Sequence, residues 1–210
     1  MSTENAPPRS RIKQVRILLW ALVALTIVGV AAVLLFPKAP NDAPTLVAET
    51  GGPRIGGPFT LVGADGKPFS SARLAGKPFA IYFGFTRCGD VCPTTLGRLV
   101  KLRGEAGGER ALNIVFVTID PANDGPREVG QYAGLFNSPI IGLTGSAAQI
   151  GQVKKQYGIF AQPSPHPMAG KEMEHSATVL LFDRDGKLTG TIDSQEPDSS
   201  ALAKLKRLTV

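Results

Sequence analysis

The sequence predicts an α/β domain, with a central mixed sheet flanked by helices, behind a single N-terminal transmembrane helix. Residues 17–36 are 20 consecutive positions without a charged side chain. From residue 55 onward, short apolar runs of strand length alternate with stretches of helical periodicity, an order typical of domains whose helices cover a largely parallel sheet. The only two cysteines, Cys88 and Cys92, directly follow one of those apolar runs.

The uncharged run has the length of a membrane-spanning helix, because about 20 residues at about 1.5 Å each cross the roughly 30 Å core of a bilayer. Residues 1–16 contain four basic residues and the single acid Glu4, and this excess of positive charge places the segment in the cytoplasm by the positive-inside rule. We therefore expect a single-pass protein of a bacterial inner (cell) membrane, with its domain in the periplasm or outside the cell membrane. The alternative is a cleaved signal peptide, whose apolar region of about 7–15 residues would be shorter.

Residues 37–54 are rich in proline, glycine and small side chains, and we expect them to form a flexible tether. Residues 55–210 are numerous enough for one domain with its own core. The formal charge of +6 divides evenly, because four basic residues and one acid give the first 16 residues +3. The domain carries only the other +3 and has no basic-aromatic patch, so it is not expected to bind nucleic acid.

The elements of the domain follow from periodicity and turn residues. The domain opens with a hairpin from Pro58–Val62 to Phe69, because Asp65-Gly66 is a strong hairpin turn. Two later runs are apolar on both faces, as central strands are, and a second Asp-Gly turn at 185–186 predicts a late hairpin. The expected order after the first hairpin is a strand over 79–85, a helix from Pro93 to about Gly104, a strand over 113–119, a helix over 127–136, a strand over 140–144, a helix over 146–157, a hairpin of 176–182 with 187–192, and a helix over 199–208.

A strand followed by a cysteine pair that opens a helix, then a βαβ crossover and a late antiparallel hairpin, is a thioredoxin-like arrangement. A sulfur at the N-terminus of a helix meets the positive end of the helix dipole and free backbone N–H groups, which favour the thiolate. Thiolate is both the nucleophile of disulfide exchange and a metal ligand. Asp90 is expected to cap this helix.

The two cysteines are separated by three residues, so a disulfide between them would constrain the unfolded chain very little. The pair therefore indicates redox chemistry, metal binding or both. Two thiolates leave a soft metal short of ligands, and His175 stands just before a predicted strand that begins beside the first helix of such a fold. Two thiolates and an imidazole suit copper or zinc, and Cu(I) tolerates a three-coordinate site.

Three more soft donors lie near His175 in the sequence. His166, Met168 and Met173 all fall within ten residues of it, in and after a proline-rich segment. The simplest interpretation of His166 is an exposed loop residue. As a hypothesis, the three residues make an auxiliary or transfer contact with copper.

The chain resembles the Sco/SenC family in the motifs around these residues, and the resemblance covers nearly all of the domain and the membrane anchor. The motifs are Phe83-Gly84-Phe85-Thr86-x-Cys88-x-Asp90-x-Cys92-Pro93-Thr94-Thr95-Leu96, then Thr118-Ile119-Asp120-Pro121 and His175-Ser176. The resemblance implies a copper chaperone that helps to assemble the dinuclear copper A site of cytochrome c oxidase. It further implies that Cys88, Cys92 and His175 bind copper, that the cysteines form a reversible dithiol/disulfide, and that Asp120 and Asp124 lie near the site or contact a partner.

Two positions depart from the family pattern, which often has His before the first cysteine and Pro after it. Here these positions hold Arg87 and Gly89. Glycine should loosen the loop, and the cation of Arg87 should favour the Cys88 thiolate. Neither change removes a ligand.

The leading hypothesis is a membrane-anchored metallochaperone, a carrier rather than an enzyme, that binds one copper ion, Cu(I) or Cu(II). It would receive the ion from a copper donor protein and deliver it to the copper-bearing subunit of the oxidase. The alternative is a thiol-disulfide reductase that keeps the copper-site cysteines of the oxidase reduced. A peroxiredoxin-like peroxidase is a weaker third hypothesis, because Thr86 precedes Cys88 by two positions but a proline-led peroxidatic motif is absent.

Overall fold

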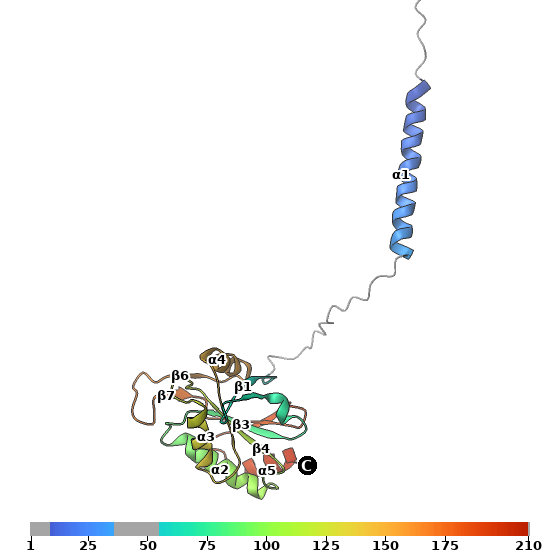
Figure 1. Ribbon diagram of the computed structural model, residues 1–210. Helices are drawn as coiled ribbons and strands as arrows, with labels where there is room; N and C mark the ends of the chain where they lie inside the picture. Colours follow the sequence, from blue (N-terminus) through green and yellow to red (C-terminus); the bar gives the residue numbers. More distant parts are fainter. Residues whose placement is uncertain (1–8, 36–54, 210) are drawn as a thin grey trace, which may run out of the picture. The chain divides into compact units, whose positions relative to one another are not determined.

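The computed structural model describes residues 9–35 and 55–209 (Figure 1). The chain divides into two units, Met1–Thr50 and Gly51–Val210, which we describe separately. The first contains helix α1 (Arg9–Leu35), and the second is the domain. The expected tether, 37–54, and the first eight residues of the expected cytoplasmic segment lie outside the described residues.

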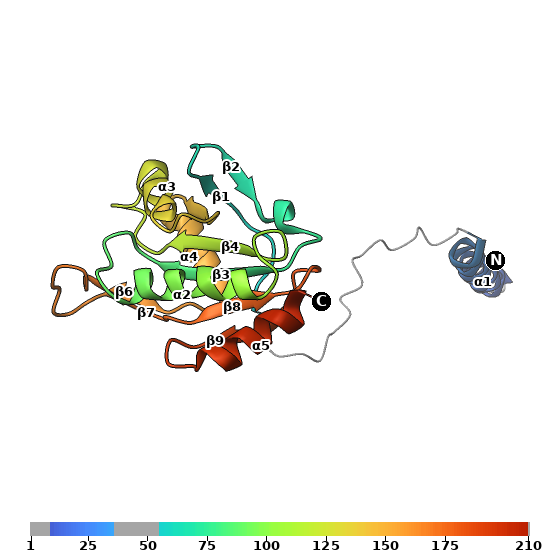
Figure 2. The same ribbon diagram turned by 90° about the horizontal axis from the view of Figure 1, so that it is seen from below.

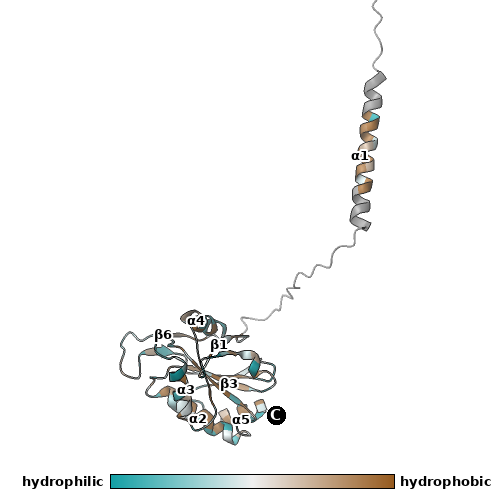
Figure 3. Ribbon diagram, in the orientation of Figure 1, coloured by the Kyte–Doolittle hydropathy of each residue, from teal (hydrophilic) through white to brown (hydrophobic). Residues whose placement is uncertain are grey.

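Helix α1 is 27 residues long, and the coloured part of its ribbon is mostly hydrophobic (Figure 3). The large apolar side chains between Val15 and Val28 are exposed. Leu25 is 76% exposed and Trp20 is 70% exposed. Across the portion of the chain that the structure describes, no helix meets both the length and the apolarity needed to span a membrane.

The domain is built on a seven-stranded mixed sheet in the order β2-β1-β5-β4-β3-β8-β9 (Figures 1 and 2). The three central strands, β5, β4 and β3, run parallel, and every other neighbouring pair is antiparallel. This is the mixed sheet that the sequence predicted. Its strands are β1 (Thr60–Gly63), β2 (Pro68–Ser70), β3 (Phe79–Gly84), β4 (Asn113–Thr118), β5 (Ile141–Thr144), β8 (Val179–Phe182) and β9 (Leu188–Ile192).

Helices cover both faces of the sheet, which explains why the central strands are apolar throughout. Helices α2, α3 and α5 lie on one face and α4 on the other (Figure 1). All six residues of β3 are buried, as are all but the first of β4, because a strand between two helical layers has no solvent-facing side. The helices are α2 (Val91–Glu105), α3 (Pro126–Gly134), α4 (Ala147–Gln156) and α5 (Asp198–Thr209), with one short 3-10 helix, Ser71–Leu74.

Both predicted hairpins are confirmed. Strands β1 and β2 pair with Leu61 opposite Phe69, and the turn glycine Gly66 has a φ of 73°. In the second hairpin, the Asp183 carboxylate accepts backbone hydrogen bonds from Asp185 and Lys187 around the turn. These short polar side chains fold the turns locally, so the strands on either side are brought into register.

A second, two-stranded sheet was not predicted. Strands β6 (Ala161–Pro163) and β7 (Met173–His175) pair antiparallel, with Ala161 opposite His175. Strands of three residues are too short to show a period of two, and the prolines between them favoured a loop. The consequence is that His175 ends β7 and does not merely precede β8.

Candidate metal centre

The two cysteines lie where β3 passes into α2. Cys88 stands in the loop, with its backbone N–H donated to the carbonyl of Phe85, and Cys92 is the second residue of α2. Both are free thiols and both are buried, with Cys88 7% and Cys92 0% exposed. The sequence-predicted position of the pair at the start of a helix is therefore confirmed.

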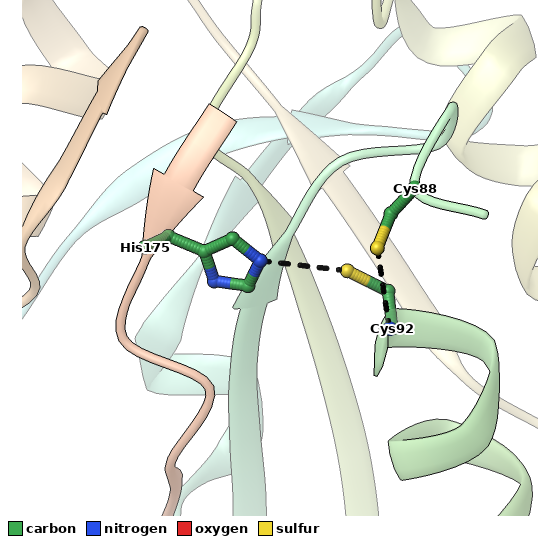
Figure 4. A group of neighbouring side chains, drawn as sticks. All are labelled: Cys88, Cys92 and His175. Atoms are coloured by element: carbon green, nitrogen blue, oxygen red, sulfur yellow. Dashed lines mark hydrogen bonds between the residues drawn. The ribbon is translucent and has the colours of Figure 1, made fainter. Parts of the chain in front are cut away.

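The cap of α2 is a sulfur atom, and the prediction that Asp90 would cap it is wrong. The Asp90 side chain makes no capping hydrogen bond, because its backbone, at φ −142° and ψ −78°, lies outside the extended region that a capping residue usually adopts. Instead, the Sγ of Cys88 accepts the backbone N–H of Cys92 at 3.3 Å (Figure 4). The N–H of Cys92 in the first turn thus points at the Cys88 sulfur.

The two sulfurs have opposite protonation preferences. The pKa of Cys88 is lowered to about 4, chiefly by the hydrogen bond from the Cys92 thiol and despite burial, with further help from backbone N–H groups. The pKa of Cys92 is raised, because its proton is shared with Cys88 and because it is buried. Near neutral pH, Cys88 is therefore a thiolate and Cys92 a thiol that donates to it.

Tyr82 completes this arrangement from β3. Its hydroxyl donates to the Sγ of Cys92 over 3.5 Å, and burial raises the pKa of the phenol, with Cys92 the next cause. From the sequence, Tyr82 is predicted only to be one residue of a buried strand. Its place two residues before Gly84, on the same face of β3, was the signal that it would lie near the site.

His175 approaches Cys92 from the opposite side. Its Nε2 lies 3.7 Å from the Sγ of Cys92, and its Nδ1 lies 3.0 Å from the carbonyl oxygen of Ser176 (Figure 4). A carbonyl only accepts hydrogen bonds, so Nδ1 carries the proton in the neutral ring and Nε2 keeps its lone pair toward the sulfur. The rings of Tyr82 and Phe85 meet the imidazole edge-on, with centroids 6.2 and 5.9 Å away, and fix its orientation.

The structure therefore brings together the three residues that the sequence singled out. The two Sγ atoms and one ring nitrogen of His175 all lie within 4.8 Å of one another. Two sulfurs and an unprotonated imidazole nitrogen at this separation form a donor set that fits a soft or borderline metal ion. The same two sulfurs are also close enough in sequence and in space for dithiol chemistry.

Gly84 leaves the space that the Cys92 sulfur occupies. A Cβ at this position would lie 2.8 Å from Sγ and 3.1 Å from the rings of Tyr82 and Phe116. We expect Gly84→Ala to lower the free energy of unfolding by about 1–3 kcal/mol through overpacking, and to weaken metal binding by displacing the sulfur. Urea denaturation and metal titration measure the two effects.

The control for this prediction is Gly97→Ala in the middle of α2, where a Cβ would meet nothing within 4 Å. This substitution should stabilise the protein by about 0.5–1 kcal/mol, because alanine is the better helix former. Equal effects from the two alanines would contradict the assigned role of Gly84.

A buried carboxylate holds the residues just before Cys88. Asp124 is fully buried and accepts three hydrogen bonds, from the backbone N–H and the hydroxyl of Thr86 and from the hydroxyl of Thr118, at 2.5–2.9 Å. Its neighbour Asp120 forms an ion pair with Arg87 at 2.8 Å. Both acids therefore tie the loop after β4 to the cysteine loop, and the guanidinium of Arg87 is engaged with Asp120.

We expect Asp124→Asn to lower the free energy of unfolding by about 3 kcal/mol, because an amide cannot accept all three donors and leaves at least one of them buried and unpaired. Denaturant titration of the reduced protein measures this change. Asp120→Asn on the same loop is the control and should cost no more than about 1 kcal/mol, since its partner Arg87 is 47% exposed. A loss for Asp124→Asn as small as that of the control would refute this role.

The remaining soft donors lie on the loop between β6 and β7 and at the start of β7. His166, Met168 and Met173 line a cavity of about 440 Å³ together with Cys88 and His175. The sequence placed them near His175 along the chain, and the structure places them around the same opening.

The fold and the three converging side chains define a thioredoxin-like domain that carries a dithiol beside an imidazole, a class of protein suited to thiol exchange or to the handling of a soft metal ion. Comparison with known proteins narrows this class. The chain matches the SCO1/SenC family over residues 47–210, which is most of its length. The chain belongs to the SCO1/SenC family.

Individual relatives agree with this assignment. The chain is 35% identical over 156 residues to the mitochondrial protein SCO2 of Saccharomyces cerevisiae, covering 72% of this chain and 52% of that protein. It is 35% identical over 134 residues to a putative copper-binding protein of Stutzerimonas stutzeri, covering 63% of this chain and 66% of the relative. The matches thus span between about half and two thirds of these two curated relatives.

Solved structures of relatives share the fold. Bradyrhizobium japonicum ScoI, determined with copper bound, is 34% identical and superposes with a TM-score of 0.63, covering 73% of this chain and 99% of that one. Yeast Sco1, also determined with copper bound, is 30% identical with a TM-score of 0.63, covering 74% of this chain and 88% of that one.

Proposed function

We propose that this protein is a copper chaperone that binds one copper ion through Cys88, Cys92 and His175 and delivers it to the copper A site of cytochrome c oxidase. The observation that carries the proposal is the convergence of the two Sγ atoms and a histidine nitrogen within 4.8 Å. Two relatives of known structure have been determined with copper bound, which supports copper as the cargo. The oxidase subunit and a copper donor protein are the proposed partners.

The site is prepared for a cation in two respects. Cys88 is already a thiolate, and the lone pair of His175 Nε2 already faces the sulfurs. Only Cys92 must lose a proton when copper binds, so binding releases about one proton and weakens as the pH falls. Cu(I) is favoured by thiolate ligands, and its transfer to a partner needs only ligand exchange without a change in oxidation state.

The test is an anaerobic titration of the reduced full-length chain with Cu(I), in competition with a Cu(I) chelator. Wild type should bind one equivalent, and Cys88→Ser/Cys92→Ser should lose that high-affinity equivalent. A double variant that competes for Cu(I) as well as wild type would refute the proposed site.

A second function rests on a different observation, the low pKa of Cys88 beside a protonated Cys92. A thiolate paired with a resolving thiol can reduce a disulfide by exchange. The protein could in this way keep the copper-site cysteines of the oxidase reduced, and both roles use the same dithiol. The two functions differ in their need for His175.

We further propose that residues 17–36 anchor the chain in a bacterial inner membrane, with 1–16 in the cytoplasm, 37–54 as a tether and 55–210 in the periplasm or outside the cell membrane. Support comes from the 20-residue run without a charge and from the exposed apolar side chains of α1. Alkaline extraction of membranes tests this proposal. The chain should stay in the membrane pellet, and its release into the supernatant would contradict the anchor.

A further inference from the structure

The cavity beside the cysteines is lined by donors at graded depth. Cys88 at its base is 7% exposed, Met173 is half-buried and packs against the core, and Met168 at the opening is 62% exposed. His166 is exposed on the same loop. Two thioethers and an imidazole therefore line the same cavity as the Cys88 sulfur and are more exposed than it is.

The loop that carries His166 and Met168 and leads into Met173 is hydrogen-bonded to the cysteine loop. The backbone N–H of Gly89, next to Cys88, donates to the carbonyl of Gly170 at 3.2 Å. The two glycines are in such close contact that a Cβ on Gly170 would lie 2.8 Å from the Gly89 nitrogen. A proline at position 89 would have no N–H to donate, so this contact requires a residue other than proline there.

Hydrogen bonds within the loop fix its shape. The N–H of Ser164 donates to the carbonyl of Glu172 at 2.8 Å and extends the β6–β7 pairing. The N–H of Lys171 donates to the carbonyl of Met168 at 2.8 Å, and the N–H of His166 donates to the Ser164 hydroxyl at 3.3 Å. His166 and Met168 are thus held on a turned segment at the opening of the cavity.

The chemistry of these donors is that of a weaker Cu(I) site. Thioethers and imidazole are soft or borderline ligands that favour Cu(I), but they carry no negative charge and bind it less tightly than two thiolates. The free energy of a copper ion that first contacts the outer donors therefore falls as the ion moves to the sulfurs. Asp90, Lys171 and Glu174 also line the cavity, and none of them is a soft ligand.

We propose that His166, Met168 and Met173 form an outer Cu(I) site through which copper enters and leaves the Cys88/Cys92/His175 centre. This inference rests on the proposed function. Each step exchanges one ligand for another, copper remains Cu(I), and the proton of Cys92 is released when copper reaches the inner site. The outer donors change the rate of loading and not the final affinity, because they are not ligands of the inner site.

Binding at the outer site is tested first, with the inner site removed. The full-length chain with Cys88→Ser, Cys92→Ser and His175→Ala is titrated anaerobically with Cu(I) against a weak chelator. We expect one weakly bound equivalent, with sulfur and nitrogen scatterers in its X-ray absorption spectrum. Adding His166→Ala, Met168→Leu and Met173→Leu should abolish it. Absence of binding in the first protein, or unchanged binding in the second, overturns the proposal.

Loading kinetics are then measured with the inner site intact. The variant with His166→Ala, Met168→Leu and Met173→Leu should take up Cu(I) from a Cu(I)–chelator complex several-fold more slowly than wild type and reach the same final affinity. Gln162→Ala, an exposed change on β6 outside the cavity, should leave the rate unchanged. Equal rates for wild type and the triple variant overturn the role in transfer.

The two proposals fail in distinguishable ways. If wild type and Cys88→Ser/Cys92→Ser bind Cu(I) equally, the proposed inner site is wrong, whatever the outer donors do. If the inner site binds Cu(I) but the protein without it binds none, only the outer site is wrong.

Discussion

His175→Ala should weaken Cu(I) binding at least about a hundredfold while leaving the cysteines able to exchange disulfides. Changes to the hydrogen-bond partners of metal ligands alone typically cost about 10–100-fold in affinity, and this substitution removes a proposed ligand itself. The Cys88 pKa should stay low, because the hydrogen bond from Cys92, its largest cause, remains. Chelator competition measures the first effect, and exchange with a small disulfide measures the second.

The other histidine provides the matched control. His166 is exposed and lies outside the inner ligand set, so His166→Ala should keep the equilibrium affinity of wild type. This pair of variants also separates the two proposed functions in cells. A loss of oxidase assembly with His175→Ala as severe as with Cys88→Ser supports copper delivery. Normal assembly with His175→Ala would contradict it and favour the reductase.

The second large effect is the pH dependence of Cys88 alkylation. With a pKa of about 4, Cys88 should react with iodoacetamide at a rate that is constant near neutrality and falls only as the pH drops through about 4. At pH 6 it carries about 300-fold more thiolate than an ordinary cysteine with a pKa of about 8.5. A low-pKa thiolate is a weaker nucleophile, so the midpoint of the profile is the test rather than the absolute rate.

The lowered pKa of Cys88 also makes the contribution of this thiol to the free energy of unfolding depend on pH. The pKa of Cys88 is lower in the folded than in the unfolded state, so the folded state binds fewer protons between the two values. The stabilisation is complete above about pH 8.5, the unfolded value, and is lost as the pH falls through about 4.

In the alkylation experiment, mass spectrometry should find the alkyl group on Cys88 and not on Cys92, whose pKa is raised. A midpoint near 8.5, or equal labelling, would refute this assignment.

Much of the fold could be predicted because its signals are local. The Asp-Gly turns, the apolar runs of β3 and β4, and the cysteines at the start of α2 each depend on a few adjacent residues. The small β6–β7 sheet could not be predicted in this way, since three-residue strands have no readable period and their pairing spans about ten residues of loop.

In the candidate site, too, features with a local sequence signal could be predicted and features without one could not. Cys88, Cys92 and His175 were identified from residue type and family resemblance, and the structure places them together. The capping of α2 by the Cys88 sulfur was missed, because it depends on the backbone angles of Asp90. The burial of Asp124 was also missed, since an acid after a strand looks the same in sequence whether it faces solvent or Thr86.

The division of the chain into two sheets has a thermodynamic consequence for the proposed cargo. Cys88 and Cys92 belong to the framework of the main sheet, whereas His175 ends a strand of the small one, and the two sheets share no strand. An ion held by all three residues would cross-link the two sheets, so its affinity would include the free energy of docking the β6–β7 hairpin onto the main sheet. By reciprocity, a partner that binds the β6–β7 hairpin and displaces it would change the affinity for copper by the same factor by which copper changes the affinity for that partner.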